Sequence, residues 1–276
     1  MTSHLLPSDL QRKLASTRGH TVSFVLPAFN EEENITKAVD STLVVASRWC
    51  AGYEVIVVDD GSSDRTAELV RGIAARNPEV RLVQHSKNMG YGHALRSGFS
   101  AATQEFVFYT DSDNQFDMNE FPLLLAWADQ ADVVAGFRKV RQDPAIRRAN
   151  AWAWNRLVRA LFYVPVRDVD CAFKLYRREP LAAVQIESRG AMIDTEIIVK
   201  LARRGSMIVE VGVTHLPRTA GTARGAKLQV ILRALREVWH MYPLLSRLDS
   251  GSPPVSSVTS AGSGQPLEMN PQQAAV

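Results

Sequence analysis

Three aspartates follow a stretch of mostly apolar residues, and their spacing suits a divalent cation. Residues 106–110 read "FVFYT", and Asp111, Asp113 and Asp117 come directly after them. Residues two apart on extended backbone point to the same side, so the carboxylates of Asp111 and Asp113 would repel each other unless a cation lies between them or one is protonated. Hard oxygen ligands suit Mg²⁺ or Mn²⁺. Such an ion could bind a diphosphate and stabilise it as a leaving group.

The same acids also suit a purely structural role, because an Asp-x-Asp at a strand end is often only a solvated turn. A calcium-binding EF-hand loop fits poorly, since Phe116 stands where that loop needs glycine. The glycines at 90, 92 and 98 miss the G-x-G-x-x-G spacing of dinucleotide-binding loops, and no P-loop motif is present. A solvated turn and a metal site therefore both remain open from this segment alone.

Another acidic tip lies earlier in the chain, in the segment "VVDDGSSDRT". Asp59 and Asp60 follow the apolar run Val55–Val58. An Asp-Gly turn, with Ser63 or Asp64 capping the next helix, would give these residues a purely structural role. A carboxylate directly after a buried strand could also accept hydrogen bonds from a nucleobase or from ribose hydroxyls.

Alternating apolar and amphipathic segments predict an α/β sandwich around a mostly parallel sheet. Buried parallel strands read as continuous apolar runs, and ligands bind at the carboxyl ends of such strands. Three polar tips should therefore meet at one edge: Asn30-Glu31, Asp59-Asp60 and the acids after Thr110. The predicted strands are 21–29, 55–58, 80–85, 105–110 and 131–138, and the predicted helices are 30–49, with Asn30 as its cap, 65–77, 92–103 and 118–130.

The second half of the chain is less regular. Helices are predicted at 144–164, at 194–205 with Gly205 ending the helix, and at 227–248. A loop and strand are expected over 168–179 and a strand over 207–217. The domain organisation that follows is a polar N-terminal arm at 1–20, one domain at 21–248 and a disordered tail at 249–276, where serine, glycine, proline and glutamine dominate.

Two of these helices interleave basic and aromatic residues, as helices at a membrane interface do. The alternative is that both pack on the domain with their basic faces in water. The residues concerned are Arg147, Arg148, Arg156, Arg159, Trp152, Trp154, Leu161 and Phe162 in the first helix, and Lys227, Arg233, Arg236 and Trp239 in the second.

Composition excludes several classes of protein. The chain has 276 residues, of which 46% are hydrophobic and 22% charged, and its net charge of +3 is too small to indicate a nucleic-acid partner. Two cysteines cannot form a disulfide framework or a cysteine-based zinc site. No signal peptide or apolar run of about 20 residues is present, so we expect a cytoplasmic protein, at the inner face of the membrane if its acceptor is a lipid.

Four motifs in order resemble family 2 glycosyltransferases, which have the GT-A nucleotide-sugar-binding fold. They are "LPAFNEEENI", "VIVVDDGSSDRT", "NMGYGHALRSGF" and "YTDSDNQFD", and the resemblance covers roughly residues 21–225. Within that family the chain looks most like the dolichyl- or polyprenyl-phosphate mannose and glucose synthases. That closer likeness depends on Gln115, on "AGFR" ending at Arg138, on "DVDCAFKLYRR" and on "LPRTAGTAR".

The resemblance implies a role for each matched position. Donor-binding residues would be Pro27, Phe29 and Glu31 at the base and ribose, Val58 and Asp60 at the base, and Asp111, Ser112 and Asp113 at the ribose and diphosphate. The metal, Mg²⁺ or Mn²⁺, would be held by Asp113 and Gln115 with Asp111 close by. Arg138, Arg218 and Arg224 would meet phosphate groups, for which guanidinium forks are suited.

The implied reaction is inverting transfer of a sugar from GDP-mannose or a UDP-hexose to a polyprenyl phosphate. Such an acceptor is already ionised near pH 7 and needs no strong base. A hydroxyl acceptor would need a carboxylate to take its proton, and Asp168 and Asp170 are the candidates. An inactive sugar-nucleotide-binding module is a further alternative. Phe29 in place of tyrosine, Ser112 in place of alanine, and Cys171-Ala172 depart from the family pattern and leave sugar and acceptor open.

Overall fold

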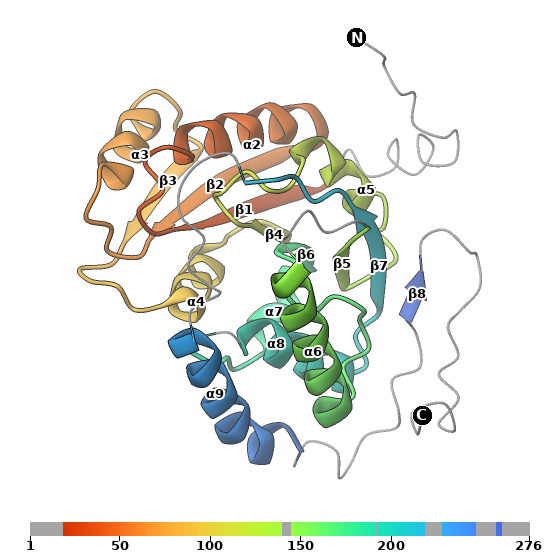
Figure 1. Cartoon of the computed structure of the whole chain (residues 1–276). Helices are drawn as coiled ribbons and strands as arrows, with labels where there is room; N and C mark the ends of the chain where they lie inside the picture. Colours follow the sequence, from red (N-terminus) through yellow and green to blue (C-terminus); the bar gives the residue numbers. More distant parts are fainter. Residues whose placement is uncertain (1–18, 140–144, 191, 219–227, 247–257, 261–276) are drawn as a thin grey trace.

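A computed structural model describes residues 19–139, 145–190, 192–218, 228–246 and 258–260 (Figure 1). Most of the predicted arm (1–20), most of the predicted tail (249–276) and Arg224 lie outside the described residues. The strands are β1 (Thr21–Ala28), β2 (Gly52–Asp59), β3 (Val80–Gln84), β4 (Phe106–Thr110), β5 (Val133–Arg138), β6 (Phe173–Arg177), β7 (Ile208–Val213) and β8 (Val258–Ser260). The helices are α2 (Ile35–Trp49), α3 (Thr66–Ala74), α4 (Tyr91–Ala101), α5 (Phe121–Leu125), α6 (Ala145–Phe162), α7 (Arg178–Ala182), α8 (Ile193–Arg203) and α9 (Leu228–Ser246), with a 3₁₀ turn η2 (Met118–Glu120).

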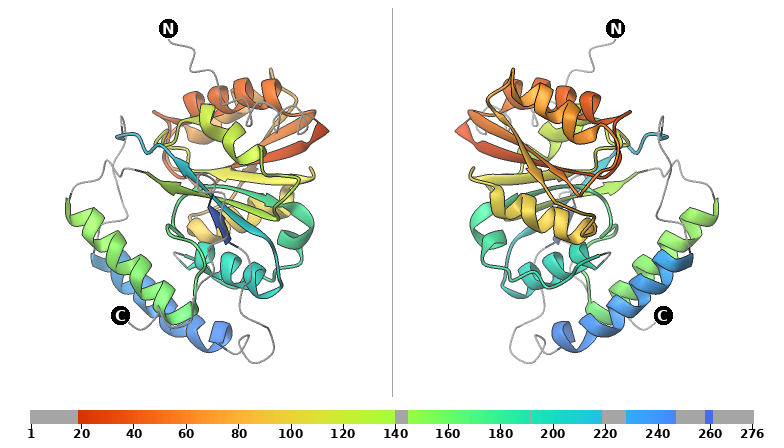
Figure 2. Two further views of the ribbon diagram at one scale, coloured as in Figure 1. Left: turned by 90° about the vertical axis from the view of Figure 1, so that its right-hand side faces the viewer. Right: turned by 90° about the vertical axis from the view of Figure 1, so that its left-hand side faces the viewer.

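The described strands form one sheet in the order β3-β2-β1-β4-β6-β5-β7-β8. All described pairings are parallel except those of β6, which runs antiparallel to both β4 and β5. Helices α2, α3 and α5 cover one face, and α4, α7 and α8 cover the other (Figures 1 and 2). The predicted α/β sandwich around a mostly parallel sheet is confirmed.

The central strands are buried for nearly their whole length, which explains their continuous apolar sequences. Every residue of β4 is buried, and so are the last seven of β1 and the last six of β2. Aromatic rings fill the layer above them: the ring centroids of Phe24 and Phe108 are 5.6 Å apart, and those of Phe108 and Phe173 are 4.8 Å apart. Rings of this size dominate the apolar area that a core buries.

Three local predictions differ from the structure. Helix α2 begins at Ile35, and Asn30 is not its cap: Asn30 has φ 53° and its side chain accepts a hydrogen bond from the Ser63 N–H at 2.8 Å. The helix predicted at 118–130 is only η2 and α5, because the chain then tightens into turns before entering β5. Within the predicted disordered tail, Val258–Ser260 pairs with β7.

Helices α6 and α9 lie side by side away from the sheet (Figure 2). The rings of Phe162 in α6 and Tyr242 in α9 have centroids 6.1 Å apart, and Val158 of α6 and Met241 and Leu245 of α9 are buried. Their outer side chains are exposed, with Trp152 at 67% and Trp239 at 85%. None of the helices in the described ranges combines the length and apolar character needed to cross a bilayer.

Candidate active site

The three predicted polar tips meet at the carboxyl ends of β1, β2 and β4. Strand β1 lies between the other two, with Pro27 opposite Val58 and with Val25 opposite Tyr109. The acidic loop after β4 is fastened to this edge by Ser112, whose buried hydroxyl donates to the Pro27 carbonyl at 2.8 Å. The prediction that parallel strands would bring these segments together is confirmed.

Asp111 and Asp113 lie in this loop close enough for the Asp113 carboxylate to act on the pKa of Asp111, and each accepts few hydrogen bonds. The Tyr91 hydroxyl donates to Asp111 at 3.1 Å, and the Gln115 N–H donates to Asp113 at 3.1 Å. Burial and the neighbouring Asp113 carboxylate raise the pKa of Asp111 to about 7. Burial also raises the pKa of Asp113 above its usual range, against the opposing effect of Arg218. The pair therefore attracts positive charge.

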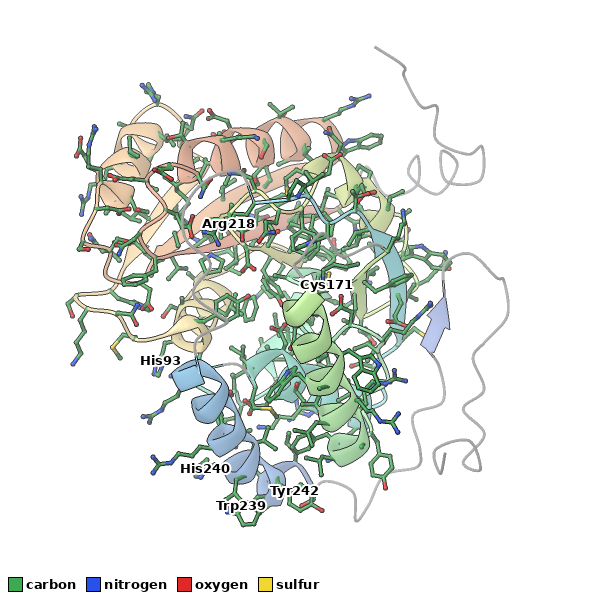
Figure 3. All side chains as sticks on the ribbon, in the orientation of Figure 1. His93, Cys171, Arg218, Trp239, His240 and Tyr242 are labelled. Carbon is green, nitrogen blue, oxygen red and sulfur yellow. The ribbon has the colours of Figure 1, made fainter. Side chains whose placement is uncertain are left out.

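Arg218 brings one positive charge to the loop from a distant part of the chain. One of its guanidinium nitrogens donates to Glu31 at 2.8 Å, and the other lies 3.4 Å from Asp113. The side chain lies beside β1 (Figure 3). Glu31, Asp113 and Arg218, predicted separately from three segments, are thus gathered at one place.

The loop fits a divalent cation that is shared with a ligand rather than enclosed by protein. Among the described residues, no group of three or more His, Cys, Asp and Glu side chains is arranged to hold a metal ion. Two mutually repelling carboxylates would supply part of a coordination sphere, and phosphate oxygens and water commonly supply the rest for Mg²⁺. The Gln115 side-chain amide donates to the Leu216 carbonyl at 3.2 Å, so one arm of that predicted ligand holds the segment that leads to Arg218.

The residues predicted to bind the base lie at the carboxyl ends of β1 and β2. Phe29 is half-buried at the end of β1. The side chain of Val58 is fully buried, and its Cγ2 lies 3.2 Å from the position that a Cβ on Gly98 would take, so it packs against α4 from within the core. Asp60 is only 3% exposed and accepts hydrogen bonds from the Met89 and Gly90 N–H groups, both at 2.8 Å. Asp60 therefore fixes the loop that leads into α4.

The predicted phosphate-binding and acceptor residues fall into two groups. Arg138 makes a two-pronged ion pair with Asp168, with both N–O distances at 2.6 Å. Asp170 instead accepts one hydrogen bond, from the Trp154 indole at 3.2 Å. Burial and the Asp194 carboxylate raise the pKa of Asp170 to about 6. Of the two candidate bases, Asp170 has the pKa suited to proton transfer near neutrality.

Two features of the site were not predicted from the sequence. Tyr91 stands at the start of α4, in a segment whose sequence is marked by its glycines rather than by its tyrosine. A buried group of Tyr109, Lys174 and Asp194 lies below the acids: the Lys174 ammonium donates to the Tyr109 hydroxyl at 2.9 Å and to Asp194 at 2.8 Å. A lysine within a strand of otherwise apolar character was the available signal, because a buried charge requires a partner.

Comparison with known proteins places these residues in a family. The family model of glycosyl transferase family 2 matches residues 23–184, more than half of the chain. An undecaprenyl-phosphate 4-deoxy-4-formamido-L-arabinose transferase of Pectobacterium atrosepticum is 33% identical over 214 residues, which cover 76% of this chain and 64% of that protein. Glycosyltransferase AglD of Haloferax volcanii is 31% identical over 77% of this chain and 36% of its own length. The chain thus spans less than two thirds of these relatives.

Solved structures agree on the fold. Glucosyl-3-phosphoglycerate synthase from Mycobacterium tuberculosis, crystallised with Mn²⁺, UDP and phosphoglyceric acid, superposes with a TM-score of 0.63 at 23% identity, covering 93% of this chain and 87% of that one. Mannosyl-3-phosphoglycerate synthase from Rubrobacter xylanophilus gives a TM-score of 0.65 at 21% identity, covering 91% and 82%. The predicted GT-A fold is confirmed, and this chain belongs to glycosyl transferase family 2.

Proposed function

We propose that this protein transfers a sugar, with inversion, from a nucleotide-sugar such as GDP-mannose or a UDP-hexose to a polyprenyl phosphate. The observation that carries the proposal is the close pair Asp111 and Asp113, whose raised pKa values mark a place built for positive charge. Charged groups with a structural role in a core are usually neutralised by partners within the protein. These two carboxylates have few such partners besides Arg218, which lies beside Asp113.

In this proposal Asp111 and Asp113 hold Mg²⁺ or Mn²⁺, with Gln115 as a further candidate ligand. The ion would supply charge neutralisation for the diphosphate leaving group. Arg218 would exchange part of its hydrogen bonding to Glu31 for a phosphate oxygen, because a guanidinium fork suits phosphate. Glu31 and Phe29 would then bound the nucleoside side of the donor, beside the loop that Asp60 holds through the Met89 and Gly90 N–H groups.

The acceptor is proposed from the names of the relatives that act on undecaprenyl phosphate. A phosphate acceptor is ionised near neutrality, since the second pKa of a phosphate ester is about 6. The chain would then need to orient the acceptor and exclude water rather than remove a proton. Arg138 is paired with Asp168 and also acts to lower the pKa of Asp111, and we assign it the role of attracting the acceptor phosphate.

Lipid acceptors reach an enzyme at a membrane surface, and we place peripheral contact on the outer sides of α6 and α9. Trp152 and Trp239 are largely exposed there, and the Arg156 guanidinium lies 5.9 Å from the centroid of the Trp152 ring. Exposed tryptophan next to arginine is the composition of an interfacial helix. Figure 3 shows Trp239 and Tyr242 on the outer end of α9.

A hydroxyl acceptor is the second candidate, and one observation favours it. Asp170 is half-buried, and its pKa of about 6 would let it take a proton near pH 7. Asp170→Asn would then abolish transfer, whereas it would leave transfer to a phosphate acceptor within a few-fold of the unsubstituted protein.

The test is release of nucleotide from a panel of GDP- and UDP-sugars, with Mn²⁺ or Mg²⁺, with and without polyprenyl phosphate in anionic vesicles. Release that requires both metal and lipid phosphate, and that is lost in Asp113→Ala, is the expected result. Metal-dependent release that ignores the lipid would replace the proposal with a hydroxyl acceptor. Nucleotide binding without release from any donor would point to a binding module.

A further inference from the structure

A carboxylate on α9 collects hydrogen bonds from the loop that leads into α8. Oε1 of Glu237 accepts from the Ser188 hydroxyl at 2.7 Å, from the Arg189 N–H at 3.0 Å and from the Gly190 N–H at 2.8 Å. Oε2 accepts from the Met192 N–H at 3.3 Å. Four donors from five residues on one side chain fix the position of this short segment relative to α9.

A different carboxylate holds the start of the same loop. Glu196 of α8 accepts from the Glu187 N–H at 2.9 Å and from the Ser188 N–H at 2.7 Å. The loop therefore keeps one anchor when Glu237 is removed. Glu237 governs the part of the loop from Arg189 onward.

That part of the loop packs backbone to backbone on the first turn of α4. A Cβ on Gly92 would lie 2.6 Å from the carbonyl carbon of Arg189 and 2.8 Å from the Gly190 nitrogen. Approach this close is open only to a glycine. The Arg96 guanidinium, one turn further along α4, donates to the Ile186 carbonyl at 3.1 Å. A displacement of the loop must therefore move the first turn of α4 or open a gap beside it.

The first turn of α4 carries the tyrosine of the acidic site. Tyr91 is the first residue of α4, and its hydroxyl donates to Asp111 at 3.1 Å. On the other side Asp60 holds Met89 and Gly90 in place through their N–H groups. The position of Tyr91 is thus set from two sides, by Asp60 at the end of β2 and by Glu237 through the loop.

We propose that Glu237 is a positioning residue for the acidic site. It acts through the loop at Ser188–Met192 and the first turn of α4 on the Tyr91–Asp111 hydrogen bond. Small displacements of such contacts lower rates strongly, because catalysis depends on sub-ångström placement of the reacting groups. The kinetic consequence rests on the function proposed above, whereas the mechanical consequence does not.

The mechanical test is amide hydrogen exchange of the full chain without ligands, in Glu237→Ala and Glu237→Gln. Expected is faster exchange at residues 189–192 and also at Ala94 and Leu95 in α4, with β1 and β4 unchanged. Glu187→Gln is the matched control: it removes an exposed carboxylate of the same loop, whose ion pair with Lys200 at 3.4 Å has little energetic weight. Faster exchange confined to residues 189–192 would overturn the proposal, even if the protein turned over no donor at all.

The kinetic test compares Glu237→Gln, Tyr91→Phe and the double variant in nucleotide release with a short-chain polyprenyl phosphate. Glutamine keeps one oxygen for the Oε1 donors and guards against loss of folding. We expect kcat to fall about tenfold in Glu237→Gln with KM for the donor within twofold, and the double variant to be no slower than the slower single variant. If the reductions in kcat of the two single variants multiplied in the double variant, Glu237 would not act through Tyr91, and the proposal would be overturned. If the exchange result held but the unsubstituted protein released no nucleotide, the failure would lie with the proposed reaction.

Discussion

The two acidic tips of the sheet resemble each other in sequence and differ in their electrostatics. Both follow buried parallel strands, β2 and β4. In the first tip, which follows β2, Asp60 and Asp64 are surrounded by donors. Asp64 accepts from the Thr66 N–H at 3.0 Å and from the Glu32 N–H at 3.1 Å. Partial burial acts to raise the pKa of Asp64, but these hydrogen bonds outweigh it and the pKa lies below its usual range.

In the second tip the balance is reversed. Burial raises the pKa values of both Asp111 and Asp113; the Asp113 carboxylate adds to the rise at Asp111, and the Glu31 carboxylate adds to the rise at Asp113. The first tip is therefore neutralised within the protein, and the second is the tip that we propose to be completed by a bound cation. A carboxylate whose demand for positive charge is unmet is a better sign of a functional site than a carboxylate after a strand.

The largest expected effect distinguishes the tips by activity. Asp113→Ala should lower turnover by about 10²–10³-fold, since it removes a proposed ligand of the cation that would stabilise the leaving group. Unfolding by urea should show no loss of stability, because a repulsive partner of Asp111 is removed. Turnover within a few-fold of the unsubstituted protein would mean that the second tip is structural, like the first.

The next effect should be on stability and should come from the first tip. Asp60→Ala leaves the part-buried N–H groups of Met89 and Gly90 without this acceptor, and the two lost hydrogen bonds should together cost about 1–3 kcal/mol. Asp60→Asn keeps one acceptor oxygen and should cost less. The free energy of unfolding from urea titration measures both, and an Asp60→Ala protein as stable as the original would contradict the structural role of Asp60.

A third effect concerns pH and metal together. The folded-state pKa of Asp111 is raised from 3.8 to about 7, so the folded protein holds more protons than the unfolded chain and loses stability as pH rises through that window. A bound cation should remove this loss: Mn²⁺ at 100 times its Kd adds about 2.7 kcal/mol. We expect the rise in Tm with Mn²⁺ to be larger at pH 7.5 than at pH 5.5. In Asp113→Asn, both the loss of stability with rising pH and the rise in Tm with Mn²⁺ should be smaller. A rise in Tm with Mn²⁺ that does not depend on pH would mean that the ion binds elsewhere.

The smallest effect should come from the edge of the first tip. The N-cap of α3 is Arg65 and not the predicted Ser63 or Asp64, but Asp64→Ala removes the acceptor of the Thr66 N–H and should cost about 1 kcal/mol, the usual value of one hydrogen bond. Nucleotide release should stay unchanged. A large loss of activity in this variant would show that the first tip also takes part in the reaction.

The order of elements and the meeting of the tips were predictable, because apolar runs followed by polar residues fix where parallel strands end. The pairing of Arg218 with Glu31 was not, since it joins residues 187 positions apart. Nor was the two-pronged pair of Arg138 with Asp168, because sequence types alone cannot tell an arginine that waits for phosphate from one that already has a carboxylate. The position of β6 between β4 and β5 was also missed, since a single antiparallel strand has the same apolar pattern as its parallel neighbours.

The insertion of β6 has a consequence for how the chain is made. Strands β1 to β4 assemble from neighbouring segments, but the free edge of β4 is filled by residues 173–177, which follow β5 in the chain. During synthesis, the fully buried strand β4 therefore stays an open edge until β6 emerges from the ribosome, well after β5. Chains that stop after β5 should be prone to aggregate, and the interval between the two strands is when a growing chain most needs a chaperone.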